Sequence, residues 1–133
     1  MNCGMNPWRT STLAAVMICV AASIGRAQAN DDEADAALFL ESVVMAKRGP
    51  LCAARIAGFA EKFEPALARW RADRAVRLDK GEAVLRAAAA KEQLDFALHV
   101  ATVTDTAARL LGKASQAVLE TNCEAMHRRV VDP

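Results

Sequence analysis

Residues 52–70, which read CAARIAGFAEKFEPALARW, decide the fold of this chain. Apolar side chains recur in this stretch at steps of four and three residues, at Cys52, Ile56, Phe59, Phe63, Leu67 and Trp70. Such spacing places them on one face of an α-helix. The pattern stays in phase across Pro65. The sequence therefore predicts a continuous second helix over residues 50–78 that is kinked at Pro65.

The rest of the chain also has the composition of helices. Alanine, the strongest helix former, occupies 24 of the last 104 residues, and no stretch alternates polar and apolar residues as a half-buried strand does. Acidic residues crowd the start of an expected helix at 32–48, and Gly49-Pro50 follows its end. A turn at 79–81 precedes a long third helix, and the fourth helix carries Leu119–Val130. We expect an all-α fold, a small four-helix bundle with helices of unequal length.

Residues 1–29 have the layout of a secretory signal peptide. Arg9 closes a short basic segment, residues 13–23 form an apolar run, and Ala27 and Ala29 stand at the −3 and −1 positions. An apolar helix of eleven residues spans about 16 Å, roughly half of a bilayer core. We therefore expect cleavage after Ala29 and a single helical domain over 30–133. The product would be periplasmic or secreted, with no transmembrane segment after cleavage.

Cleavage would leave only Cys52 and Cys123 of the four cysteines. Two thiols in an exported chain are expected to form one disulfide, and their Cα atoms must then lie within about 7 Å of each other. The long third helix has possible breaks near Thr104 and near Gly112. At 1.5 Å per residue, a reversal near Gly112 returns Cys123 closest to the level of Cys52. We therefore predict a turn near Gly112 and one disulfide.

Charge and residue types exclude several classes of function. The chain has 17 Lys+Arg and 16 Asp+Glu, a formal net charge of +1, whereas nucleic-acid-binding domains usually have a pI above about 9. Ser42 and Ser115 are the only serines after residue 29, and the chain contains neither a Gly-x-Ser-x-Gly elbow nor a glycine-rich phosphate loop. We expect no nucleic-acid partner and no enzymatic activity.

The two histidines lack the partners of a metal site. Asp95 and His99 share a helical face, as do Cys123 and His127, but zinc needs three or four ligands. In its length, helical class and predicted export, the chain resembles the four-helix b-type cytochromes of the periplasm. This resemblance implies Met and His as axial haem ligands. His127 occupies a comparable place, but Met45 lies near the end of the expected first helix rather than its start. We expect no metal and no cofactor.

A basic segment is the candidate contact surface. Arg71, Arg74 and Arg77 are spaced three residues apart, so they share a broad helical face that could meet an anionic surface or an acidic protein. We therefore expect a small exported protein of the bacterial envelope, a non-catalytic accessory or protein-interaction module with an unidentified envelope partner. The alternatives are an inhibitor or immunity-type protein against an envelope enzyme, and a bundle that binds a small ligand. Residues 52–70 resemble segments of uncharacterised small exported bacterial proteins, which implies no activity.

Overall fold

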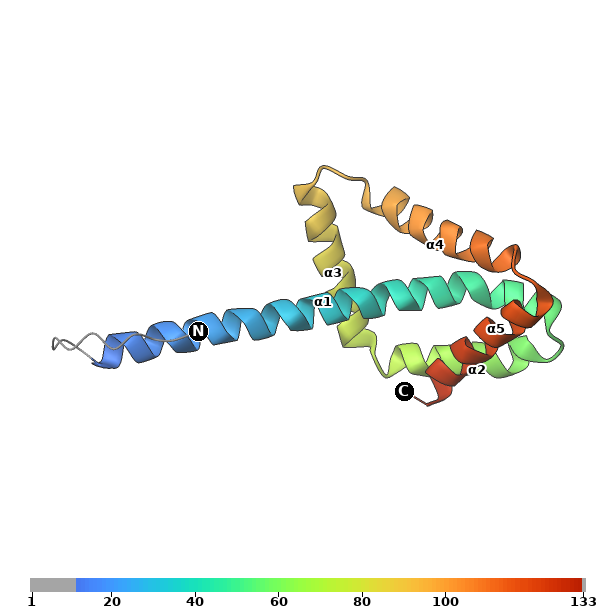
Figure 1. Ribbon diagram of the computed structural model, residues 1–133, viewed down its shortest axis with the longest axis horizontal. Coiled ribbons are helices and arrows are strands. Elements are labelled where there is room, and N and C mark those ends of the chain that lie inside the picture. Colours follow the sequence, from blue (N-terminus) through green and yellow to red (C-terminus); the bar gives the residue numbers. More distant parts are fainter. Residues whose placement is uncertain (1–11, 133) are drawn as a thin grey trace. The chain divides into compact units, whose positions relative to one another are not determined.

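A computed structural model describes residues 12–132 of the chain, with side chains from residue 29 onward. Its described residues are helical without a strand, in the order α1 (Thr12–Arg55), α2 (Phe59–Ala72), α3 (Ala75–Lys91), α4 (Phe96–Gly112) and α5 (Gln116–Val131) (Figure 1). The chain divides into two units, residues 1–31 and residues 32–133. The all-α prediction is confirmed, but the prediction of four helices is wrong, because the described chain forms five.

The expected helix end at Gly49-Pro50 is wrong, because α1 continues through both residues to Arg55. Gly49 instead permits a close contact between α1 and α2. A Cβ added at Gly49 would lie 2.9 Å from a ring carbon of Phe63, which is closer than carbon atoms normally pack. The glycine therefore lets the two helices approach each other, and its role is packing rather than termination.

The predicted second helix over 50–78 is interrupted in two places. The chain reverses at Gly58, which has φ of +73°. This backbone conformation costs glycine little, whereas it costs other residues about 1–2 kcal/mol. A second break at Asp73-Arg74 separates α2 from α3. Helix α2 does run unbroken through Pro65. The change of direction that we assigned to a kink at Pro65 lies at Gly58.

The predicted turn at residues 79–81 is wrong, because Gly81 lies inside α3. Gly81 is the point where α3 crosses α1, and a Cβ at this position would overlap the main-chain carbonyl of Asp35. A glycine inside a helix loses about 1 kcal/mol of helix propensity relative to alanine. The close crossing of two backbones accounts for its presence here.

The third predicted helix is also divided, because a four-residue turn separates α3 from α4. Gln93 is the one non-glycine residue of the described chain with positive φ, at 57°. The amide of Gln93 donates to the carbonyl of Ala90, and the amide of Leu94 donates to that of Ala89. These two bonds form a Schellman motif, which terminates a helix. The side chain of Asp95 then caps α4 by accepting a hydrogen bond from the amide of Leu98 at 2.9 Å.

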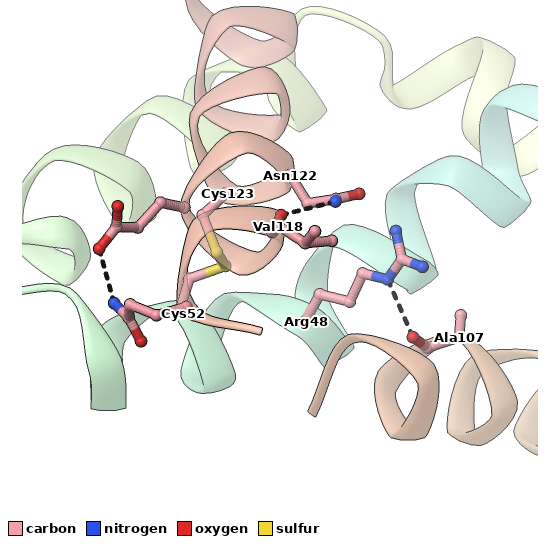
Figure 2. Close-up of a disulfide and its surroundings, with 8 residues drawn as sticks. Arg48, Cys52, Ala107, Val118, Asn122 and Cys123 are labelled. Atoms are coloured by element: carbon pink, nitrogen blue, oxygen red, sulfur yellow. Dashed lines mark hydrogen bonds between the residues drawn. A yellow bond between two sulfur atoms is a disulfide. The ribbon is translucent and has the colours of Figure 1, made fainter. Parts of the chain in front are cut away.

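The predicted turn near Gly112 is confirmed. Helix α4 ends at Gly112, and the side chain of Ser115 caps α5 through the amide of Val118. The reversal brings Cys123 to Cys52, with a Cα–Cα distance of 5.8 Å, and the predicted disulfide is present (Figure 2). Both sulfur-bearing residues are fully buried.

The hydrophobic core lies around this disulfide, between residues 32–55 of α1, helix α2 and helix α5. Trp70 is 1% exposed, and Phe63 and Phe59 stack with their ring centroids 5.0 Å apart. An exposed ion pair, Arg129 to Glu41 at 2.6 Å, adds a link between α5 and α1, and this pairing raises the pKa of Arg129. We call these three helical segments the stapled core.

The predicted signal peptide is only partly described by the structure. Its first eleven residues lie outside the described residues, and residues 12–29 belong to α1. Within the part of the chain that the structure describes, no helix is both long enough and apolar enough to span a bilayer.

Candidate protein-interaction surface

Residues 75–112 comprise α3, α4 and the turn between them, and we call this pair of helices the arm. Among the described residues of the main hydrophobic cluster, the arm contributes only Leu111, while the others come from α1, α2 and α5. Several large apolar side chains of the arm are exposed instead: Val76, Leu94, Leu98, Val103 and Leu110. The arm therefore buries little of its own apolar surface.

Polar contacts attach α3 to α1 at their crossing point. Arg77 donates to the carboxylate of Asp35 at 2.6 Å, and Lys80 lies 3.2 Å from the same carboxylate and 2.9 Å from that of Asp32. The hydrogen bond from Arg77 holds the pKa of Asp35 below its usual value, against the opposing effect of burial. The hydrogen bonds to Asp32 and Asp35 raise the pKa of Lys80. This cluster fixes one end of the arm.

The other end of the arm is attached through α4. The Nε–H of Arg48 donates to the carbonyl of Ala107 at 3.2 Å (Figure 2). Lys47 pairs with Asp105 at 2.8 Å. Both Lys47 and Asp105 are more than half exposed, and exposed ion pairs contribute about 0–1 kcal/mol. Polar contacts thus attach both helices of the arm to α1.

A groove opens between the two helices of the arm and α1. It encloses a cavity of about 140 Å³, and its lining is almost entirely apolar: Leu40, Leu85, Ala88, Ala89, Glu92, Leu94, Phe96, His99 and Val100. We call it the arm groove. Glu92 and His99 are its only charged or titratable lining residues among those described. An apolar hollow with few polar groups is the usual form of a binding site.

Local structure explains how the arm groove forms. The Schellman motif at Gln93 folds Leu94 back toward Ala89, and a contact between these two positions commonly accompanies the motif. Phe96, the first residue of α4, lies beside Phe39 with centroids 6.3 Å apart. The guanidinium of Arg86 lies 4.2 Å from the centroid of the same ring, a cation–π contact. These contacts hold one wall of the groove in place.

The size of the arm groove limits what it can bind. Sites for cofactors and drug-sized ligands enclose about 300–1,000 Å³, whereas a dry cavity of about 150 Å³ holds a benzene ring. The cavity of about 140 Å³ therefore fits one apolar side chain. Protein interfaces concentrate their binding energy in such anchor residues seated in pockets.

The predicted basic face does not lie on one helix, because Arg71 is in α2, Arg74 is in the break that follows it and Arg77 is in α3. Arg71 donates to the Ser42 hydroxyl at 2.8 Å and to its carbonyl at 3.2 Å. Arg77 pairs with Asp35, and Arg74 lies 4.8 Å from the centroid of the Trp70 ring and donates to the Trp70 carbonyl. Each guanidinium thus has an intramolecular partner. Because a guanidinium has five N–H donors, some of them remain for other contacts.

The two histidines lie at different surface hollows. His99 lines the arm groove, and His127 lines a more open hollow of about 270 Å³ with Phe59, Lys62 and Glu124. No group of three or more metal-ligating side chains occurs among the residues that the structure describes. The arm groove was not predicted from the sequence, because the turn that forms it contains no glycine or proline. The one sequence signal for this turn was Asp95, since aspartate is a preferred capping residue at the start of a helix.

Comparison with known proteins gives no assignment: the chain matches no protein-family model, no curated protein and no solved structure.

Proposed function

We propose that this chain is an exported, non-catalytic protein-interaction module of the bacterial envelope, and that the arm groove receives an apolar anchor side chain of its partner. The observation that carries the proposal is an apolar groove, large enough for one side chain, between α1 and the arm, which contributes only Leu111 to the main cluster among the described residues. Elements that bind partners are commonly drawn from the less stable parts of a protein. The stapled core serves as the rigid support.

Two features support export. The unit that contains the core begins at Asp32, close to the expected cleavage site after Ala29. The disulfide closes a loop with a sequence separation of 71 residues, and structural disulfides persist mainly in oxidising compartments. Export predicts that the protein isolated from its own cells begins at Asn30. An intact chain that begins at Met1 in every fraction would contradict it.

Site-specific photo-crosslinking tests the binding proposal in the producing cell. A photoreactive residue at position 99, in the arm groove, is expected to give a discrete crosslinked product. The matched control is position 117, which lies on the exposed side of α5. A product from position 99 that disappears in a Leu94→Asp background supports the groove as the binding surface. Equal products from both positions, or none from position 99, would overturn it.

A further inference from the structure

We propose that the partner in the arm groove is a second copy of this chain, bound by antiparallel pairing of two α4 helices about Val103. This inference rests on the proposed function, since it requires that the groove binds protein. It assigns Leu110 as the anchor side chain.

Helix α4 has an apolar side that is partly exposed. Phe96, Val103 and Leu110 are seven residues apart, so they lie along one side of the helix. Val103 is 36% exposed and Leu110 is 63% exposed. Phe96 lines the arm groove at the start of α4, and Leu110 lies near the C-terminal end of the same helix. One side of α4 thus has a hollow at one end and an apolar projection at the other.

Symmetry makes this arrangement self-complementary. A two-fold axis at Val103 exchanges position 96 of one copy with position 110 of the other, because each lies seven residues from position 103. Antiparallel pairing therefore places Leu110 of each copy against the Phe96 end of its partner, where the groove opens. The same surface then serves both copies, as a closed two-fold dimer requires.

The charges of α4 favour the same pairing. Glu92 and Asp95 lie in the turn that precedes α4, whereas Arg109 lies in the last turn of α4 and Lys113 directly follows it. All four are exposed. None of these four side chains forms an ion pair with another residue in the part of the chain that the structure describes. Antiparallel helices bring the acidic end of one copy to the basic end of the other. Parallel pairing would instead place like charges together, which disfavours it.

A cysteine on the symmetry axis gives the sharpest test. In the full chain with Cys3→Ser and Cys19→Ser, Val103→Cys is expected to form an intermolecular disulfide, because a residue on a two-fold axis faces its own copy. Leu98→Cys is the matched control, since Leu98 is on another side of the same helix and is 67% exposed. Non-reducing electrophoresis measures the covalent dimer. Comparable dimer from both variants, or none from Val103→Cys, would overturn the proposal.

Charge reversal gives an independent test, because a second substitution that restores dimerisation cannot be explained by a loss of folding. Lys113→Glu is expected to weaken dimerisation of the otherwise unchanged chain about three- to tenfold, because two symmetry-related contacts are each worth a fraction of a kcal/mol. Adding Glu92→Lys is expected to restore it. Sedimentation equilibrium measures the dimer constant, and circular dichroism checks that the helices remain. A wild-type chain that stays monomeric at every concentration, or a double variant no better than Lys113→Glu, contradicts the pairing.

The position-99 photo-crosslink separates this inference from the proposed function. A product of twice the chain's mass supports both. A product that contains a different protein overturns the second copy as partner and leaves the groove as a binding surface. The absence of any product overturns both.

Discussion

The stapled core and the arm are built from the same kind of residue pattern, but they are stabilised in different ways. Two aromatic side chains of the core, Trp70 and Phe63, are at most 2% exposed, and a disulfide crosses it. The arm has a longer helical sequence than α2 and α5 together, yet it contributes one residue to the main cluster. Helical amphipathicity alone therefore does not determine which helices form a core. The core supplies stability, and the arm retains an exposed apolar surface.

Removal of the disulfide is expected to have the largest effect on the difference between the two regions. A loop with a sequence separation of 71 residues gives about 4 kcal/mol of stabilisation in the chain-entropy model. Cys52→Ala and Cys123→Ala should each lose about that much, and the double variant should lose little more, because both changes remove one bond. Chemical denaturation measures the free energy of unfolding. Losses that add fully would show that the cysteines act separately.

Two glycines in the arm provide the next test. Gly81→Ala places a methyl group against the main-chain carbonyl of Asp35, and such overpacking typically costs about 1–3 kcal/mol. Gly112→Ala meets no atom within 4 Å and is expected to stabilise the chain by about 0.4–1 kcal/mol through the unfolded state. Thermal unfolding should therefore shift in opposite directions. Equal shifts would show that α3 does not cross α1 at Gly81.

Some features of the stapled core and the arm could be predicted from the sequence alone. The apolar residues at 52–70 were predictable as core positions, because their spacing is local. The disulfide followed from the expected loss of the other two cysteines, and the turn near Gly112 followed from helix length once Cys52 and Cys123 were expected to pair. The roles of Gly49 and Gly81 were not predictable, because each glycine sits where two helices approach, and that contact depends on the tertiary arrangement. Gln93 gave no signal of a turn, since it adopts a conformation more common for glycine.

The pH dependence of the arm is expected to be local. The pKa of Asp35 is lowered mainly by its hydrogen bond from Arg77, so this contact contributes stability above the unfolded pKa of about 4. The contribution is lost as pH falls through the lower folded value. Hydrogen exchange at α3 amides should therefore accelerate in acid more than exchange in α2. Asp35→Asn should remove most of that difference, and an unchanged difference would mean that another group anchors the arm.

The smallest expected effect comes from Gln93, at the turn that forms the arm groove. A side chain at φ of 57° has a steric cost of roughly 1–2 kcal/mol that glycine avoids, while glycine gains freedom in the unfolded chain worth about 0.4–1 kcal/mol. Gln93→Gly should therefore stabilise the chain slightly, by about 0.5 kcal/mol from the difference between these costs. Hydrogen exchange at the main-chain amides of positions 93 and 94 measures the change locally. A matched Glu92→Gly change, at a position with negative φ, should destabilise the turn, and the opposite signs would establish that the arm groove depends on the backbone conformation of residue 93.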